Sequence, residues 1–330
     1  MRSYDVTVFD GPLSLNERPT PQPVGEEVLV KITAAGVCHS DIHICDGFYD
    51  LGGGKRLNMG DRGMKLPITM GHEIAGEMVS GGPDAGPVKA GEKVVVFPWI
   101  GCGKCAVCAR GEENLCLQSR FLGVFRNGGY ATHVIVPAKR YCLPIGDMDT
   151  AVAAPYACSG LTTYSALKKI GAKVYEREPV VVIGAGGLGL MCLTLMKAMG
   201  AHGAIVVDVN PSSREAAMKA GALAAIDPKA PDAVAAIRKL TPDGAGAAAV
   251  IDLVGAGATV QLGLDVMARG GRVIVVGLMG GDVTVPTPTI PQRAMTLQGS
   301  YVGNLEELRE LMALVAKGGV PRVPLIEQIG

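Results

Sequence analysis

The alternation of strand-like and helix-like segments in the second half of the chain constrains the fold most. From about residue 156 onward, short Val- and Ile-rich runs alternate with apolar stretches of helical length. Strands and helices that alternate at this spacing form a parallel sheet with helices on both faces. The same reasoning predicts one helix over 258–271, a strand over 296–302 and a helix over 304–319.

The first half of the chain has a different pattern. Its β-branched, partly alternating runs are separated by Gly, Pro and Asp, which is typical of strands and turns. The segment 47–67 is polar and rich in glycine, and we expect a surface loop or lobe there. We therefore predict a β-rich domain over 1–155 and an α/β domain over 156–302. The expected strands of the first domain are 28–36, 73–80, 92–99 and 130–137.

A glycine-rich turn joins the first strand of the α/β domain to its helix. The sequence GAGGLG (184–189) follows the strand VVVI and opens an apolar helix, as the dinucleotide-binding fingerprint requires. Such glycines let the backbone turn tightly and approach a pyrophosphate at the helix N-terminus. Asp208 ends the next strand, where a carboxylate binds the adenosine ribose and repels a 2′-phosphate. This favours NAD over NADP, although Arg214 is near. The expected cofactor contacts of this region are Gly184, Gly186, Gly187, Leu188, Gly189, Asp208, Val209 and Arg214.

Composition and charge exclude several functional classes. Lys+Arg and Asp+Glu are both 31, so a net charge of zero gives no reason to expect nucleic acid or an anionic membrane as partner. The window 179–196 carries no charge and is long enough to span a bilayer. Its clustered glycines are better explained by a buried strand, a turn and a buried helix. The N-terminus has no apolar signal-peptide core, so we expect a cytoplasmic protein.

Four of the nine cysteines lie close together in the sequence. Cys102, Cys105, Cys108 and Cys116 have the spacing C-x2-C-x2-C-x7-C. Four thiolates around one ion leave no open coordination position, which predicts a closed, structural zinc site. A catalytic role is not expected for this lobe, residues 98–120.

A second set of metal-binding residue types is scattered along the chain. A catalytic zinc needs three protein ligands and one exchangeable position. Outside the four-cysteine lobe, Cys38 in GVCHSDIH, His72 in GHE and Cys158 in APYACSG form a possible set. Cys192, on the apolar helix, is expected in the core. The sequence alone does not establish that the three candidate ligands converge.

Taken in order, these motifs resemble those of the zinc-dependent medium-chain alcohol dehydrogenases. GVCHSDIH (36–43), GHE (71–73), the four-cysteine lobe, ACSGLTTY (157–164) and GAGGLG (184–189) follow one another as in that family, and the similarity covers nearly the whole chain. The resemblance implies a GroES-like catalytic domain, a Rossmann cofactor domain, NAD, and two zinc ions per chain. It also implies that the C-terminal part, 303–330, joins the first domain. The chain ends at VPLIEQIG, whereas relatives usually continue through one more helix and strand.

The resemblance also implies residue roles. Cys38, His72 and Cys158 bind the catalytic zinc, Glu73 lies behind it, and Asp41 orients His72. Ser40 and His43 relay the alcohol proton to solvent. Two further sets are implied. The cofactor contacts are His39, Thr162, Leu253, Val254, Gly277, Leu278, Ser300, Tyr301 and Val302, and the substrate-pocket aromatics are Trp99 and Phe121.

The implied reaction is the reversible oxidation of primary or secondary alcohols to aldehydes or ketones, with hydride transfer to NAD. A polyol dehydrogenase is the nearest alternative, but that branch typically has glutamate at the position of Cys158. A zinc-free quinone reductase would lack the ligands. A non-enzymatic, zinc-stabilised nucleotide-binding protein explains the glycine turn and the four cysteines but not Cys38, Ser40, His43 and His72. We expect a homo-oligomer, with a tetramer favoured over a dimer.

Overall fold

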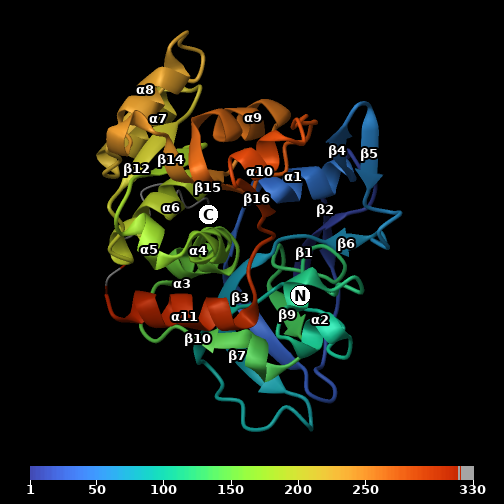
Figure 1. Cartoon of the computed structure of the whole chain (residues 1–330). Helices are drawn as coiled ribbons and strands as arrows, with labels where there is room; N and C mark the ends of the chain where they lie inside the picture. The colour runs from blue at the N-terminus through green and yellow to red at the C-terminus, as the bar shows by residue number, and fades with distance from the viewer. Residues whose placement is uncertain (319, 321–330) are drawn as a thin grey trace.

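The β-rich and α/β regions lie side by side in the computed structural model, which describes residues 1–318 and 320 (Figure 1). In the α/β region a six-stranded parallel sheet has the order β13-β12-β11-β14-β15-β16. All residues of β11 and β12 are buried, as expected for strands covered on both faces. The strands are β11 (Val180–Ile183), β12 (Ala204–Val207), β13 (Ala224–Ile226), β14 (Ala247–Asp252), β15 (Met267–Val275) and β16 (Thr296–Gly299).

Helices connect these strands and cover the sheet. The charge-free window 179–196 divides into β11 and most of α6, which confirms the predicted strand, turn and helix. No helix in the described part of the chain is long and apolar enough to cross a membrane. The helices of this region are α5 (Ala172–Tyr175), α6 (Gly187–Ala198), α7 (Pro211–Lys219), α8 (Ala233–Lys239), η4 (Pro242–Gly244), α9 (Gly257–Val266) and α10 (Thr289–Gln292).

The helix predicted over 258–271 is wrong at its C-terminal end. Helix α9 stops at Val266, and Met267 begins β15 with an extended backbone. Met267 is fully buried in the sheet core. Gly270 follows with a φ of 73°, a left-handed conformation that cannot continue a helix. The segment MARGG (267–271) therefore belongs to β15 and not to the helix.

The β-rich region contains a five-stranded antiparallel sheet of order β10-β8-β7-β3-β9 and a three-stranded sheet of order β2-β1-β6. The predicted strands 28–36 and 73–80 are present as β3 and β7, and the other two are present in shorter form. The elements are β1 (Arg2–Val6), β2 (Ser14–Glu17), β3 (Val28–Gly36), α1 (His39–Asp46), β6 (Ile68–Thr69), β7 (Glu73–Gly81), β8 (Lys93–Val96), α2 (Ala106–Ala109), η1 (Glu113–Leu115), β9 (His133–Val136), η2 (Lys139–Tyr141) and β10 (Cys142–Pro144).

The segment 47–67 is more than the predicted surface loop. It forms a hairpin of β4 (Phe48–Gly52) and β5 (Lys55–Asn58). The chain then returns inward, so that Met59 and Met64 are buried in the core. The few apolar residues of a glycine-rich segment thus anchor it to the domain.

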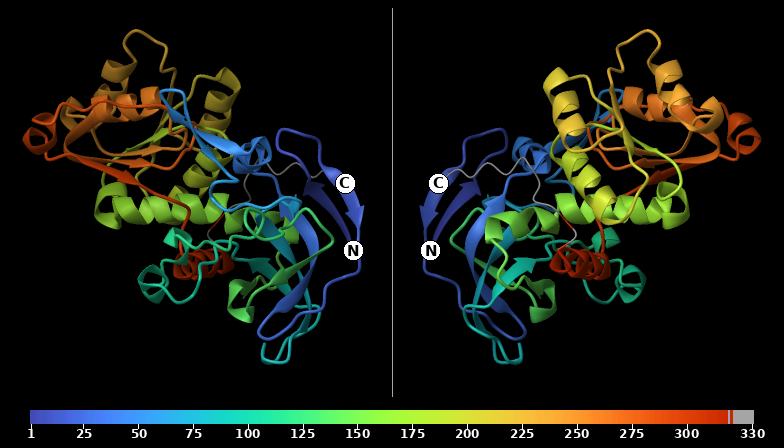
Figure 2. Two further views of the ribbon diagram at one scale, coloured as in Figure 1. Left: turned by 90° about the vertical axis from the view of Figure 1, so that its right-hand side faces the viewer. Right: turned by 90° about the vertical axis from the view of Figure 1, so that its left-hand side faces the viewer.

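A helix that the strand pattern did not predict connects the two regions. The chain passes through α3 (Thr150–Ala153) and η3 (Ala154–Ala157) into the unpredicted helix, α4 (Ser159–Ile170). Helix α4 packs against α6 and η3, and α11 (Leu305–Ala316) packs against α4 and η3. Figure 2 shows α11, in red, beside the β-rich region. This helix is the described part of the C-terminal segment expected to join the first domain; residues 319 and 321–330 lie outside the described residues.

Candidate active site

Strand pairing brings the first two candidate metal ligands together. Strands β3 and β7 run antiparallel, and Gly36 at the end of β3 pairs with Glu73 at the start of β7. His72 directly precedes Glu73, and Cys38 lies two residues after Gly36, so the two candidate ligands become neighbours. Cys158, at the junction of η3 and α4, completes the group: one ligand atom from each of the three lies within 4.8 Å of the others. The Sγ atoms of Cys38 and Cys158 are 3.9 Å apart.

Hydrogen bonds to Asp41 hold two of the three ligands in place. One carboxylate oxygen of Asp41 lies 3.0 Å from Nδ1 of His72, and the other accepts the backbone N–H of Cys38 at 3.0 Å and the hydroxyl of Tyr130 at 2.8 Å. The Asp41 carboxylate favours the tautomer with the proton on Nδ1 of His72, in which Nε2 has a lone pair available to a metal. Nε2 is buried and has no hydrogen-bond partner among the described residues. An orphaned buried nitrogen beside two thiols fits a zinc ion.

Glu73 lies directly behind this triad. One of its carboxylate oxygens accepts the backbone N–H of Ser159 at 3.1 Å, which links β7 to the start of α4. Burial raises the pKa of the Glu73 carboxyl to about 8. The hydrogen bond from Cys158 lowers the pKa of the Cys38 thiol to about 4, so Cys38 favours the thiolate form that binds metal. Any residue larger than glycine at 36 would meet the Glu73 carboxylate at 2.0 Å.

The triad opens onto a cavity of about 530 Å³ between the two regions. The cavity reaches the carboxyl ends of β11 and β14, where the strand order of the parallel sheet reverses and ligands bind in such folds. Most sequence-predicted site residues line it: Cys38, His39, Ser40, His43, His72, Glu73, Trp99, Cys158, Thr162, Gly184, Gly186, Gly187, Leu188, Gly189, Asp208, Leu253, Val254, Gly277, Leu278, Tyr301 and Val302.

Several predicted site residues do not line the cavity. Asp41 lies behind His72, and Ser300 is buried with a hydroxyl that has no partner among the described residues. Arg214 pairs with Asp227 at 3.3 Å and donates to the backbone oxygen of Asp208, so it is held away from the cavity. Val209 is exposed outside it.

Phe121 is fully buried behind the cavity wall. Its ring packs edge-on against that of Trp99, with centroids 5.3 Å apart. Trp99 itself lies on the cavity, 5.2 Å from the His72 ring, and its indole N–H donates to the backbone oxygen of Ala157 at 2.9 Å. Phe121 thus supports the aromatic wall without forming its surface.

Part of the cavity wall consists of residues that the sequence did not predict. Tyr49 and Arg62 come from the hairpin segment 47–67, which has no recognisable motif. Hydrophobic wall residues also come from other elements, and only their position in the fold reveals them. The additional lining residues are Val37, Ile44, Tyr49, Met59, Arg62, Val124, Pro155, Ser159, Met191, Val276 and Met279.

Helix α1 presents polar side chains to the same cavity. Ser40 and His43 are three residues apart on one helix face, and both line the cavity. The His43 ring lies 5.1 Å from the rings of both His39 and Tyr49. Burial, together with the neighbouring His39, lowers the pKa of His43, so the imidazole is neutral at pH 7 and can accept a proton.

The glycine turn has the backbone that a dinucleotide requires. Gly184 has a left-handed φ of 97°, and a Cβ on Gly189 would approach the Gly184 oxygen to 2.2 Å, so neither position suits a larger residue. Gly186 and Gly187 face open space at the N-terminus of α6. Asp208 accepts the N–H of Ala185 at 2.8 Å and stands beside the turn. This cradle fits a pyrophosphate and an adjacent ribose.

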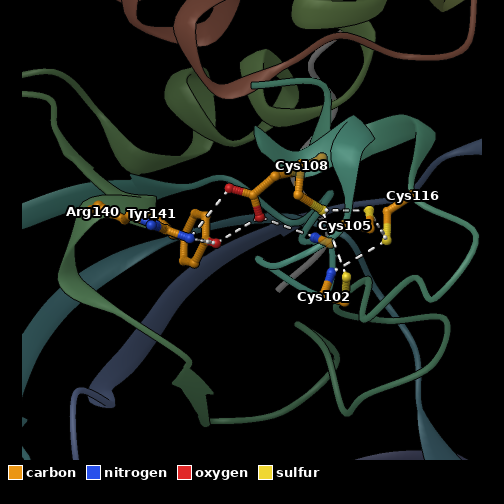
Figure 3. A network of polar contacts seen from close by, with 8 residues as sticks. Cys102, Cys105, Cys108, Cys116, Arg140 and Tyr141 are labelled. Atoms are coloured by element: carbon orange, nitrogen blue, oxygen red, sulfur yellow. Dashed lines mark hydrogen bonds and ion pairs between the residues drawn. The ribbon is translucent and has the colours of Figure 1, made fainter. Parts of the chain in front are cut away.

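The four cysteines of the lobe do not line the cavity. Their Sγ–Sγ separations run from 3.5 to 3.9 Å for the three pairs in contact (Figure 3). Four thiolates at tetrahedral corners around zinc would be about 3.8 Å apart. The Glu113 carboxylate accepts the N–H of Gly101 at 3.1 Å and the hydroxyl of Tyr141 at 2.7 Å, which ties the lobe to the five-stranded sheet. The next residue, Asn114, donates to the backbone oxygen of Tyr301 at 2.9 Å.

Comparison with known proteins gives consistent matches along the chain. Residues 25–147 match the model of the alcohol dehydrogenase GroES-like domain, and residues 187–317 match that of the zinc-binding dehydrogenases. An NAD-dependent alcohol dehydrogenase of Sulfurisphaera tokodaii is 40% identical over 321 residues, covering 97% of this chain and 90% of that protein.

Two solved structures resemble the whole chain. The alcohol dehydrogenase of Aeropyrum pernix superimposes with a TM-score of 0.85 at 30% identity, covering 97% of this chain and 91% of that one. The D-arabinose dehydrogenase of Sulfolobus solfataricus has a TM-score of 0.84 at 30% identity, covering 97% and 94%. Both the GroES-like and the parallel-sheet regions therefore have counterparts in proteins of known structure.

Proposed function

Because the chain belongs to the zinc-dependent medium-chain alcohol dehydrogenase family, we propose that it oxidises primary or secondary alcohols reversibly to aldehydes or ketones with NAD as the hydride acceptor. The observation that carries this proposal is the shared cavity. The Cys38–His72–Cys158 triad and the glycine turn line the same space, so an alcohol hydroxyl and a nicotinamide could meet there.

Two zinc ions per chain are part of the proposal. Cys38, His72 and Cys158 would hold one, with Glu73 behind it, and Cys102, Cys105, Cys108 and Cys116 would hold the other. Zinc in the first site supplies a Lewis acid that lowers the pKa of an alcohol hydroxyl, and NAD supplies the hydride acceptor. The chain's own residues bind, orient and move the proton.

The proposed residue roles are supported by contacts or by position on the cavity. Asp41 keeps the proton on Nδ1 of His72, so that Nε2 faces the metal position. Ser40 takes the alcohol proton, and His43, one turn further along α1, passes it toward solvent. Thr162, whose buried hydroxyl has no partner among the described residues, is available to the cofactor. The carboxylate of Asp208 receives the adenosine ribose.

Replacing His43 with alanine should lower kcat about 10- to 100-fold, because the relay loses its final proton acceptor. The pKa of His43 lies below its ordinary value, so wild-type kcat should be full above that ordinary value and fall as acid protonates the imidazole. The pH profile of kcat checks both statements. Added imidazole should restore part of the lost rate. A variant with unchanged kcat and an unchanged profile would exclude His43 from the relay.

The test of the function is NADH formation from NAD across primary, secondary and polyol substrates, before and after chelation. We expect turnover that is lost with the chelator and returns with added zinc. Zinc-loaded, folded protein without activity on any alcohol would contradict the proposal and favour a zinc-stabilised nucleotide-binding protein. Zinc counting also separates the two functions: two ions per chain support the enzyme, and one supports the binding protein.

A sugar or polyol substrate is the second candidate. It is favoured by the likeness to the D-arabinose dehydrogenase of Sulfolobus solfataricus. The substrate panel separates the two, because a polyol enzyme would show a much higher kcat/KM for a polyol than for a simple alcohol of the same length.

We further propose a homo-oligomer, with a tetramer favoured and a dimer as the alternative. Strand β16 forms one edge of the six-stranded sheet, and all four of its residues are exposed. Such an edge is available for pairing between chains.

We also propose that residues 1–155, together with 303–330, form the catalytic domain and that residues 156–302 form the cofactor domain.

A further inference from the structure

The wall of the cavity carries one positive charge that the proposed reaction does not use. Arg62 lines the cavity and comes from the chain that follows the hairpin β4–β5. No carboxylate lies within ion-pair distance of its guanidinium among the described residues. The neighbouring Asp61 accepts a hydrogen bond from Asn58 instead, at 3.0 Å.

Arg62 lies among aromatic side chains. Its guanidinium lies 5.7 Å from the centroid of the Phe125 ring. It also stands beside the phenols of Tyr49 and Tyr301, where it opposes the rise in pKa that burial causes in each. Both tyrosines line the cavity together with Arg62. Arg62 is thus an exposed residue with aromatic neighbours, and its guanidinium is available to bind an anion.

Arg62 lines the same cavity as the triad and lies close to Tyr301. The ring of Tyr301 lies 6.4 Å from that of Trp99, and the ring of Trp99 lies 5.2 Å from that of His72. A substrate whose hydroxyl reaches the triad can therefore meet Arg62 with a group at its other end.

The other charges on the cavity do not neutralise Arg62. Glu73 lies behind the triad, and Asp208 lies at the glycine turn. Thiolates of Cys38 and Cys158 would balance the two charges of a zinc ion. This leaves the positive charge of Arg62 unbalanced on the cavity wall. Arginine binds carboxylates through paired, charge-assisted hydrogen bonds.

We infer that Arg62 selects substrates that carry a carboxylate at the end remote from the reacting hydroxyl, such as ω-hydroxy acids. This inference rests on the proposed function and names its substrate class. The carboxylate takes no part in the reaction: the hydroxyl carbon gives its hydride to NAD, the hydroxyl proton leaves through the relay, and an ω-oxo acid forms with NADH.

The test compares ω-hydroxyhexanoate with its methyl ester, which has the same hydroxyl and chain but no charge. Wild type should show a kcat/KM about 10- to 100-fold higher for the acid. Arg62→Leu should bring the ratio near one by lowering only the value for the acid, and Arg62→Lys should keep part of the preference. Lys65→Leu is the matched control. Lys65 is three residues from Arg62, exposed and outside the cavity. Its replacement removes the same charge and should leave the ratio unchanged.

A binding measurement separates failure of this inference from failure of the proposed function. Calorimetry of hexanoate and hexanamide with the zinc-loaded protein and NADH needs no turnover. Hexanoate should bind wild type about tenfold more tightly than it binds Arg62→Leu, whereas hexanamide should bind both equally. Equal hexanoate affinity, or an Arg62→Leu defect shared by acid and ester, would overturn the inference. Selective hexanoate binding without oxidation of any alcohol would leave it standing and reject the dehydrogenase proposal instead.

Discussion

Replacing Cys38 with serine should lower kcat/KM for alcohol oxidation by about a thousandfold or more, while NAD binding persists. The variant removes a thiolate from the triad, and the loss of the Lewis acid costs several kcal/mol of transition-state stabilisation. The glycine turn, which we propose as the NAD site, lies on different elements and is untouched. Initial rates, NAD binding by calorimetry and zinc content should be measured on the same preparation.

Cys45→Ser is the control for this prediction. Cys45 lies on the same helix, is also half-buried, and does not line the cavity. It should keep full activity and zinc content. Turnover retained by Cys38→Ser would show that the triad is not the reaction centre, whatever its zinc content.

Replacing Cys105 with serine should instead affect stability. The Sγ atom of Cys105 contacts those of Cys108 and Cys116, so its loss opens the four-cysteine site. Structural zinc contributes directly to folding free energy, and a loss of several kcal/mol lowers the unfolding midpoint by about 10 °C. Zinc content should fall by one ion per chain. The midpoint should be measured by calorimetry with and without added zinc.

The two cysteine variants test separate sites. If Cys105→Ser loses activity at low temperature as completely as Cys38→Ser while staying folded, the four cysteines have a direct part in the reaction. If its midpoint and zinc content equal those of wild type, the lobe holds no ion. Cys45→Ser again provides the reference for the stability measurement.

Local patterns account for what the sequence could predict. The strand β11, the glycine turn and α6 are contiguous, so the order of residue types alone determines their arrangement. The four cysteines are similarly close in sequence. Cys38, His72 and Cys158 belong to three separate elements, and their convergence depends on the register of β3 and β7, in which Gly36 pairs with Glu73. Without the family resemblance, the sequence left that convergence open.

The wall of the cavity was the least predictable part of the site. Tyr49 and Arg62 lie in a glycine-rich segment whose composition suggests only a loop. Buried methionines draw that segment against the domain and so bring the two side chains to the cavity. Phe121 shows the converse: an aromatic residue predicted in the pocket packs behind Trp99, because only the fold determines which ring faces the space.

The position of Trp99 has a practical consequence. The chain contains a single tryptophan, and that residue lies on the wall of the cavity, against His72 and Tyr301. All indole emission from this protein therefore originates beside the Cys38–His72–Cys158 triad. Reduced nicotinamide absorbs in the range where indole emits, so cofactor entering the cavity should quench that emission by energy transfer. The single tryptophan should therefore report occupancy of the cavity without a label, and no second indole competes with it.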